Sequence, residues 1–535
     1  MEVKTLLQTL RSTIGKFEPE SSALRLSTMS QLSELKWPMS NWLKEFHDSL
    51  LFISAYPTNE KEEALASLLL SRIAFVLALL NDERKRQLND SGLPFTSTTT
   101  TFSYDLLQCS EKTMPGNFSF ASIDNDEALP LLLKSTLPDA LKEILTEDGM
   151  NASRILKTLF GKKKNYLRSI LSETSKLDHT STLRDQLFDA LQMNCVFRSD
   201  DKMDSLSFNH FETPKVFYHK ELLKKIDHDE WLNKKLPSPR KLNADQRVKL
   251  MRAIRMSLLL LGRETEPSTW MDENSIRIFD LERGISVCIY GMTKDHRQPL
   301  ESYFGFTAFK NGYPMSYGGA WLFGKRALFG MNIFEWFRGG ESALVFAQLL
   351  RTYRQFFGIT YFEVEPYQYG KDNPEGIQSG AFWFYHRFGF RLLKKELYEL
   401  SEAEAARIAN EKGYRTAATI LKKFTHSNIG LNLGGKEIPL APSQIRSSIA
   451  AFISQNHSGD HSKAEKEILT SFRKLTGLNA SSRDEKKVLT DLAFFIMTGK
   501  DQAHYAKKKK ELRSLIKLKN SDEAAYQQLL RNVLK

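Results

Sequence analysis

The spacing of apolar side chains divides the chain into regions of different character. Near both ends, apolar residues recur every three to four positions, which is typical of amphipathic helices, whereas the central part changes to strict alternation. Short helical patterns separated by polar stretches lie between the two. We therefore expect an α/β protein with the following regions: helical 1–100, mixed and mainly helical 101–240, α/β 241–400, a helix-and-loop extension 401–455, and helical 456–535.

The α/β region opens with alternating patterns that predict a sheet. The segment SIRIFDLERGISVCIYGM predicts two strands on either side of Glu282–Gly284. Asn311-Gly312 predicts the turn of a second hairpin, because both central residues of such a turn take positive φ. Two further strands are expected at 327–337 and 359–366. The helical pattern between these two strands predicts a parallel pair inside a mainly antiparallel sheet.

The helix between the last two strands is amphipathic. Its apolar side follows helical spacing through Ala343, Phe346, Ala347, Leu350, Tyr353 and Phe357. Its other side carries the polar residues Gln348, Arg351, Thr352 and Gln355. Gly358 is placed to end the helix. We expect this helix to pack on the sheet, and a second short helix to form within 379–390.

Local signals set several other boundaries. Asn243 and Gln246 form a capping-box pattern that predicts a helix start. Ser401 and Glu404 repeat that pattern and predict a helix that begins there and ends at Gly413. The serine- and threonine-rich segment 89–104 is expected to be a linker or an extended loop, and 430–444 is expected to be a loop.

The longest apolar run, Ala64–Leu80, is at the lower limit for a membrane span and contains Arg72, so we expect a buried helix and no membrane span. The first residues have no apolar core and no cleavage site of a signal peptide. Cys109, Cys195 and Cys288 are far apart and contain no CxxC pair, which supports neither a zinc site nor a disulfide framework. A reducing, cytoplasmic location is expected.

Positive charge is concentrated at one end of the chain. Residues 461–535 hold 17 Lys and Arg against 9 Asp and Glu, a net charge of +8 out of +12 for the whole chain. Any attraction to nucleic acid should come from this region and be sensitive to salt. A run such as Lys507–Lys510, beside Glu511, is more often a solvated helix face than a nucleic-acid contact, and no aromatic residues are interleaved with the lysines.

The turn before the amphipathic helix is a candidate phosphate site. It reads RGGESA, and the residues that would hold a phosphate are Arg338, Gly339, Gly340, Ser342 and Ala343. A helix start presents unpaired N–H groups and a partial positive charge, and glycines let a ligand approach the backbone closely. Taken alone, a Gly-Gly pair before a helix is more often a plain turn.

With its surroundings, this turn resembles the pyrophosphate loop of the GNAT acetyltransferase superfamily. The resemblance covers about 275–393, roughly a quarter of the chain or less, and includes the later family motif in Ala381, Phe384, Tyr385, Gly389 and Phe390. It implies a GNAT-like mixed sheet with flanking helices and acetyl-CoA as co-substrate, held by the backbone amides of the loop. It also implies that Tyr385 supplies a proton to the leaving thiolate. The alternative for Tyr385 is a core aromatic residue.

Two positions depart from the family pattern. Glu341 stands where the family prefers glycine, and a carboxylate beside a pyrophosphate repels it unless the side chain points away into solvent. Gln378 stands where the family usually has asparagine. The resemblance therefore supports the fold more strongly than it supports the cofactor.

Acyl transfer also needs a neutral amine, and a carboxylate on a central strand is a candidate base. Glu335 is the first candidate, since alternation places it on the face of Ile333 and Phe337. Glu363 and Glu365 share a face of the next strand, where a salt bridge or an exposed position is the alternative. His386 is a weaker candidate, and Asn373–Gly380 is expected to be a loop that shapes an acceptor pocket or merely connects two elements.

The function expected from sequence is transfer of an acyl group, most simply acetyl, from acyl-CoA to an amine, without a metal. One alternative keeps the fold but takes the acyl group from a carrier or from aminoacyl-tRNA. Another is a non-catalytic GNAT-like scaffold that binds a macromolecule. Fold alone does not decide among these functions.

Overall fold

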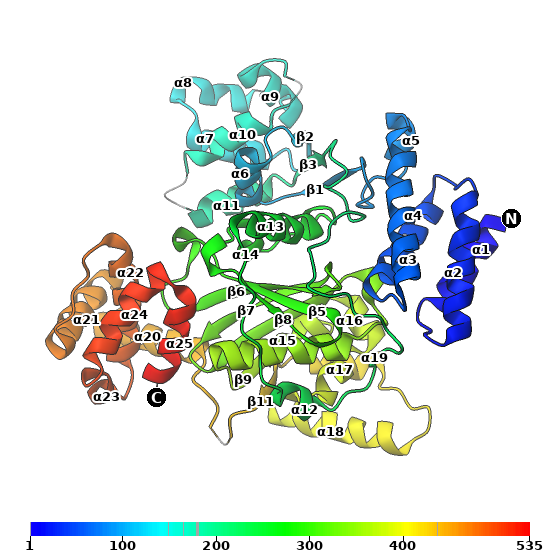
Figure 1. Cartoon of the computed structure of the whole chain (residues 1–535). Coiled ribbons are helices and arrows are strands. Elements are labelled where there is room, and N and C mark those ends of the chain that lie inside the picture. The colour runs from blue at the N-terminus through cyan, green and yellow to red at the C-terminus, as the bar shows by residue number, and fades with distance from the viewer. Residues whose placement is uncertain (1, 148, 164, 178–180, 436, 535) are drawn as a thin grey trace.

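The computed structural model describes residues 2–147, 149–163, 165–177, 181–435 and 437–534. Within these residues the chain forms an eight-stranded mixed sheet with helices on both faces (Figure 1). A separate three-stranded sheet and helical regions at both ends complete the fold. The α/β class with a mainly antiparallel sheet and flanking helices is therefore confirmed. Met1, Asp148, Lys164, Asp178–Thr180, Lys436 and Lys535 lie outside the described residues, although they fall in the predicted regions.

The N-terminal region is helical, as expected. Its helices are α1 (Glu2–Thr13), α2 (Pro19–Glu34), α3 (Asn41–Ala55), α4 (Glu60–Ala78) and α5 (Asp82–Arg86). The apolar run predicted to be a buried helix is α4, and it is buried on one side only. Ile73 is fully buried, whereas Phe75 is 66% exposed. Among the described residues, no helix is long and apolar enough to cross a membrane.

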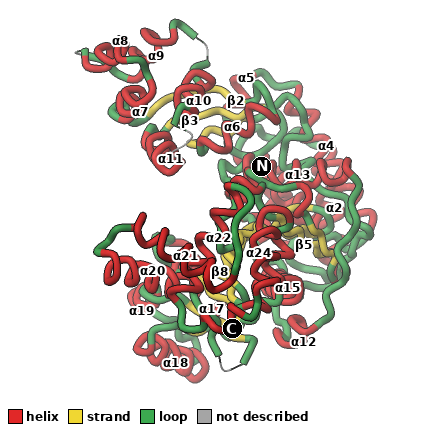
Figure 2. The backbone as a smooth tube through the Cα atoms, turned by 90° about the vertical axis from the view of Figure 1, so that its left-hand side faces the viewer, coloured by secondary structure: helices red, strands yellow, loops and turns green. Residues whose placement is uncertain are grey.

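The second region is built on a small antiparallel sheet in the order β1-β3-β2. Its elements are β1 (Ser97–Thr101), α6 (Tyr104–Thr113), β2 (Phe118–Ile123), α7 (Ala128–Thr136), α8 (Asp139–Lys142), a 3₁₀ helix (Glu143–Thr146), α9 (Ala152–Phe160), α10 (Leu167–Ser175), α11 (Ser181–Ala190) and β3 (Met193–Arg198). Figure 2 shows β2 and β3 of this sheet among α6, α7, α10 and α11. The threonine run expected to be a linker is strand β1. Threonine is β-branched and suits a strand, and the Thr98 hydroxyl donates a hydrogen bond to the Leu260 carbonyl at 3.2 Å.

The large sheet has the order β10-β11-β9-β8-β7-β6-β5-β4. Its strands are β4 (Arg277–Asp280), β5 (Ile285–Tyr290), β6 (Ser302–Lys310), β7 (Tyr313–Phe323), β8 (Arg326–Ile333), β9 (Tyr361–Val364), β10 (Arg391–Leu392) and β11 (Ile429–Asn432). Among the strand pairs that the structure describes, only β8–β9 is parallel, which confirms the predicted crossover. The hairpin turn between β6 and β7 is also confirmed, with φ of 45° at Asn311 and 85° at Gly312.

Two boundary predictions on the C-terminal side of this domain are wrong. The segment 430–444, expected to be a loop, begins inside β11, which lies between β9 and β10. The helix expected to begin at Ser401 is α18 (Lys395–Asn410), which starts six residues earlier. Inside it, the Ser401 hydroxyl donates to the Tyr398 carbonyl at 2.8 Å, so this serine caps nothing. Local capping patterns are weaker than the packing that extends a helix.

Helices cover both faces of the large sheet (Figure 1). On one face lie α13 (Ala244–Leu259), which begins with the predicted capping box, and α14 (Glu266–Thr269). On the other face lies α15 (Ser342–Phe357), which ends at Gly358 as predicted. Most of the polar side of α15 is buried as well, because the segment around α12 (His228–Asn233) covers it, although Gln355 is exposed. Arg351 is 1% exposed and donates to the Lys234 carbonyl at 2.8 Å.

The remaining elements surround this domain. They are the 3₁₀ helices Glu273–Ser275, Glu282–Gly284, Lys294–His296, Glu335–Phe337 and Pro366–Tyr369, and the helices α16 (Pro374–Ser379), α17 (Ala381–Arg387) and α19 (Ala418–Phe424). The C-terminal helices are α20 (Pro442–His457), α21 (His461–Thr476), α22 (Arg483–Thr498), α23 (Gln502–Ala506), α24 (Lys509–Ser521) and α25 (Glu523–Val533). Together they form a bundle with its own apolar core.

The basic C-terminal region is packed onto the large sheet and is not a free tail. The Lys519 ammonium lies 2.7 Å from a Glu523 carboxylate oxygen, and both side chains are 1% exposed. The same ammonium donates to the Glu301 carbonyl at 2.6 Å and to the Ser302 hydroxyl at 3.0 Å, at the start of β6. A buried lysine needs such partners. The contact fixes the bundle against the domain that carries the candidate site.

Candidate functional site

The candidate phosphate loop lies between β8 and α15. Strand β8 ends at Ile333, and the chain then forms the 3₁₀ helix Glu335–Phe337 before it reaches Arg338. Gly339 has φ of 86°, a left-handed conformation that favours glycine. A Cβ on Gly340 would lie 2.8 Å from the Tyr56 hydroxyl, so this position also requires glycine. The two glycines thus turn the chain and bring it against the end of α3.

The N-terminus of α15 is not capped by a side chain. The first helical hydrogen bond runs from Val345 N–H to the Glu341 carbonyl at 3.0 Å, and Glu341 makes no side-chain cap. Among the described residues, the backbone N–H groups of Ser342, Ala343 and Leu344 have no acceptor. Ser342 and Ala343 are only half-buried. These donors and the helix dipole favour an anion at this point.

Glu341 points inward, away from the loop surface. Its side chain is fully buried and lies 2.6 Å from the Lys310 ammonium and 2.6 Å from the Arg283 guanidinium. Burial would raise the pKa of the Glu341 carboxyl, but the contacts with His219 and Lys310 outweigh it and hold that pKa well below its usual range. The repulsion expected from a carboxylate at this position is therefore removed by ion pairing inside the protein and not by exposure to solvent.

The cluster around Glu341 carries a net positive charge. Burial lowers the pKa of Lys310 to about 8, so this lysine is still mainly charged at neutral pH. Burial also lowers the pKa of His219 to about 4, so its ring is neutral, with Nε2 3.8 Å from the Glu341 carboxylate. The negative charge of Glu341 is set against the positive charges of Lys310 and Arg283, which leaves a net charge of about +1 behind the loop. This charge adds to the attraction of the helix N-terminus for an anion.

Arg338 is held at the surface by an ion pair. Its guanidinium binds the Glu375 carboxylate of α16, and the two side chains are 48% and 61% exposed. An exposed pair of this kind contributes little to stability, about 0–1 kcal/mol. Arg338 can therefore exchange Glu375 for a bound anion at small cost.

Tyr385 lies in the core between α15 and α17. Its ring packs edge-on against Phe346, one helical turn into α15, with ring centroids 5.5 Å apart. Its hydroxyl donates to Gln368 Oε1 at 3.2 Å. Burial raises the pKa of the Tyr385 phenol, so the hydroxyl stays protonated well above neutral pH. The group is a hydrogen-bond donor and not a base.

Gln368 lies where β8 and β9 separate. The parallel pairing runs from Arg326–Leu328 of β8 against Tyr361–Glu363 of β9 and then stops. Farther along β8, the Met331 N–H donates to Gln368 Oε1 at 3.2 Å, on the side that β9 has left. One amide oxygen thus joins the open edge of β8 to the Tyr385 hydroxyl. The arrangement therefore places the Tyr385 hydroxyl, a hydrogen-bond donor, close to the part of β8 that is not paired with β9.

The structure separates the candidate bases from Tyr385. Glu335 is not on a strand, because β8 ends before it, so the predicted alternation does not apply. Its exposed side chain lines a surface hollow of about 370 Å³ together with Arg11 and Lys44 of the N-terminal region. Glu363 is buried in an ion pair with Arg326 and accepts from Asn428 Nδ2 at 2.5 Å, while Glu365 is exposed. Glu363 therefore has a structural partner, the alternative weighed from sequence.

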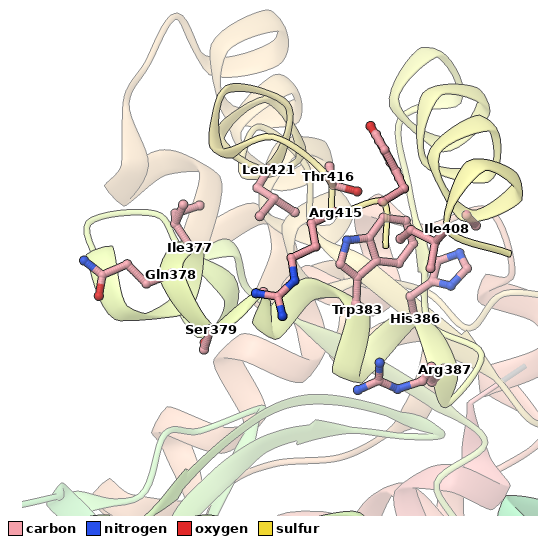
Figure 3. Close-up of a pocket in the computed structure, with 13 residues that line it drawn as sticks. Ile377, Gln378, Ser379, Trp383, His386, Arg387, Ile408, Arg415, Thr416 and Leu421 are labelled. Carbon is pink, nitrogen blue, oxygen red and sulfur yellow. The ribbon is translucent and has the colours of Figure 1, made fainter. Parts of the chain in front are cut away.

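His386 and the segment 373–380 lie at a different cavity, on the outer side of α17 (Figure 3). His386 Nε2 is 3.0 Å from the Glu402 carboxylate, and burial lowers the pKa of the ring. The segment predicted to be a loop forms α16, capped by Asn373, whose side chain accepts from the Gly376 N–H at 3.3 Å. Gln378, the second departure from the family pattern, is exposed at this cavity.

Sequence reasoning missed the residues that support the loop from inside. Tyr56 and His219 come from regions where no pattern pointed to chemistry, and only the fold brings them together. Lys310 carried a usable signal, because a lysine at the end of the apolar strand YFGFTAFK needs a partner. Arg283 has an unusual positive φ of 59°, but this conformation is visible only in the structure and gave no signal in the sequence.

Among the described residues, no group of three or more His, Cys, Asp and Glu side chains is placed to hold a metal ion. Comparison with models of protein families found no match to this chain. Comparisons with curated proteins and with solved structures found no match either.

Proposed function

We propose that this protein is an acyltransferase that moves an acyl group, most simply acetyl, from acyl-CoA to an amine. The observation that carries the proposal is the uncapped N-terminus of α15, backed by the positively charged cluster of Glu341, Lys310 and Arg283. Such a helix start suits the pyrophosphate of CoA. The resemblance to the GNAT loop and its later motif points to the same ligand.

The position of Tyr385 supports the same reaction. With the pyrophosphate at Ser342 and Ala343, the arm of CoA would extend toward the open edge of β8, where its amide groups can pair with backbone. The thioester would then lie near the Tyr385 hydroxyl. The Tyr385 ring packs against Phe346, which lies one helical turn into α15 from the loop.

In the proposed reaction, the nitrogen of a neutral amine attacks the thioester carbonyl and forms the new C–N bond. The C–S bond then breaks, and the thiolate of CoA leaves. Tyr385 donates a hydrogen bond to this thiolate as charge develops on sulfur. Its raised pKa keeps the donor proton in place but makes complete proton transfer to the thiolate unfavourable, so we assign the amine proton to solvent. Glu335 stays a candidate base only for an amine held in the hollow that it lines.

The test is calorimetric titration of the full chain with acetyl-CoA and with free CoA. We expect micromolar binding of both, weakened about tenfold or more by Arg338→Ala, since a charged contact to phosphate is lost. Arg513→Ala is the matched control, because Arg513 is an exposed arginine of α24. Absence of binding at millimolar ligand would reject the CoA donor and favour a carrier-bound or tRNA-bound donor, or the scaffold.

A further inference from the structure

A cavity of about 560 Å³ lies on the outer side of α17, enclosed by α16, α18 and α19 (Figure 3). Its volume is in the range of cavities that bind small molecules. Trp383, His386 and Arg387 of α17 share the helix face that lines it, at spacings of three and four residues. Tyr385 lies on the opposite face of the same helix, and its ring is buried in the core. This cavity is therefore separate from the candidate acyl-CoA site.

The walls of the cavity combine apolar surface with positive charge. Ile377, Trp383, Ile408 and Leu421 supply the apolar part. Arg387 and Arg415 supply two guanidinium groups, and both side chains are exposed. In the part of the chain that the structure describes, neither arginine has a carboxylate partner, and no Asp or Glu lines the cavity. Two acids bind residues of the cavity wall and already have cationic partners. Glu402 is bound to His386 and to Arg391 at 2.9 Å, and Glu404 accepts from the Tyr414 hydroxyl at 2.6 Å and pairs with Arg407.

Two polar atoms in these walls lack partners. Trp383 Nε1 and Thr416 Oγ1 are buried and have no hydrogen bond to any described residue. A buried polar group without a partner costs about 1–3 kcal/mol. Arg415, which has an exposed side chain, reaches into the cavity between Gln378 and Trp383 (Figure 3). Movement of Arg415 toward a bound anion would open the wall beside it and let a ligand reach these two groups.

We propose that this cavity binds a small molecule that joins an anionic group, a carboxylate or a phosphate, to a flat apolar body. Arg387 and Arg415 bind the anion, because guanidinium groups pair with both anions in planar geometry. The flat body packs on Trp383 and on the aliphatic side chains around it. The indole N–H and the Thr416 hydroxyl then gain hydrogen bonds to polar atoms of the ligand. The proposal does not depend on the acyl transfer proposed above.

The test is calorimetric titration of the full chain with 1-naphthyl phosphate and 1-naphthoate, with 1-naphthol and inorganic phosphate as the two halves of the ligand. We expect one of the two anions to bind at least tenfold more tightly than either half. The anion that binds identifies the group that the cavity takes. Absence of binding by both anions up to about 5 mM would overturn the proposal.

Substitutions in the cavity and in the α15 loop show which of the two sites holds the ligand. Arg387→Gln with Arg415→Gln should weaken binding at least tenfold, and Trp383→Phe, which keeps the apolar surface but removes the N–H, should weaken it several-fold. Arg338→Gln should leave the titration unchanged. If Arg338→Gln abolished binding and the double variant did not, the anion would lie at the α15 loop and the proposal for this cavity would be rejected. Both exposed arginines can be replaced without disturbing the core, so folding does not confuse the result.

Discussion

The Glu341 carboxylate lies 2.6 Å from the Lys310 ammonium, and both side chains are fully buried. Glu341 is the last residue before α15, and Lys310 ends β6, so this ion pair joins the candidate phosphate loop to the centre of the large sheet. A residue that looked unfavourable for phosphate binding is thus part of the support of the loop. Its partners decide both the shape and the charge of the site.

Removing one member of this pair should destabilise the protein strongly. Glu341→Gln leaves Lys310 and Arg283 without their buried negative partner. Lys310→Met leaves the Glu341 carboxylate without one of its two positive partners. We expect each to lower the free energy of unfolding by about 3 kcal/mol or more. The double variant should be less destabilised than the sum of the two, because Lys310 and Glu341 no longer leave each other unpaired and the charge that loses its partner, on Arg283, is 15% exposed. Urea unfolding of the four proteins measures this, and strict additivity would contradict the pairing.

The buried histidine of the cluster predicts a loss of stability in mild acid. The pKa of His219 is lowered by burial from 6.5 to about 4, so the unfolded chain binds a proton that the folded chain excludes. Stability therefore falls as the pH decreases from about 6.5 to about 4, by up to about 3 kcal/mol from this group. Below the usual pKa of a glutamate, protonation of Glu341 adds a loss of the same sign.

His219→Gln isolates this contribution, since glutamine has no proton to gain. Other histidines with lowered pKa, such as His296 and His386, give a background of the same sign in both proteins. The measurement is the slope of the unfolding free energy against pH for the two proteins. Equal slopes between pH 4 and 6.5 would show that His219 is not the group responsible.

Glu375→Gln should strengthen the binding of CoA. The substitution frees Arg338 from its carboxylate partner and removes a negative charge beside the loop. We expect acetyl-CoA to bind several-fold more tightly, with little change in stability because the pair is exposed. Calorimetric titration checks the affinity. Glu365→Gln, at an exposed glutamate with no ion pair to Arg338, is the control, and tighter binding by both variants would point to general electrostatics.

If the protein transfers acyl groups as proposed, Tyr385→Phe should lower kcat with little change in KM. The lost hydroxyl acts on the departing thiolate and not on the bound ground state, so a decrease of about 10–100-fold is expected. Tyr369→Phe is a matched control, because the Tyr369 hydroxyl binds the Ser427 carbonyl and does not contact Gln368. Equal losses in the two variants would assign the effect to packing.

The basic C-terminal bundle predicts that nucleic-acid attraction and folding can be separated. Lys507, Lys509 and Lys510 are exposed, whereas Lys519 is buried in its pair with Glu523. Replacing the three exposed lysines with glutamine should leave thermal unfolding unchanged and reduce any salt-sensitive RNA binding by about tenfold or more. Glu523→Gln should lower the unfolding temperature instead. RNA binding that survives the triple variant would place the contact elsewhere.

Sequence patterns predicted the centre of the fold better than its surroundings. The Asn311-Gly312 hairpin, the Asn243 capping box and the end of α15 at Gly358 were all confirmed, because each depends on a few neighbouring residues. The strand at Ser97–Thr101 was missed, because a threonine run is polar and forms a strand only when a partner such as β3 is available.

The candidate site shows the same division. The loop Arg338–Ala343 and Tyr385 were predicted from the sequence, and in the structure Tyr385 of α17 packs against Phe346 of α15, the helix that follows the loop. The support behind the loop depends on Tyr56 and His219, which are distant in sequence and follow no local pattern. Glu335 was assigned to a strand that ends before it, because alternation continues in the sequence after the sheet has ended.

The position of β11 between β9 and β10 constrains how the protein is made. A ribosome releases β9 well before β11, so one side of the sheet stays incomplete until residue 432 has emerged. Until then β9 has an exposed edge, and the nascent chain is open to wrong pairing at the strand that follows the candidate site. A fragment cut at the end of the apparent α/β region, near residue 400, would keep this edge permanently. The smallest piece that can complete the sheet must extend through Asn432.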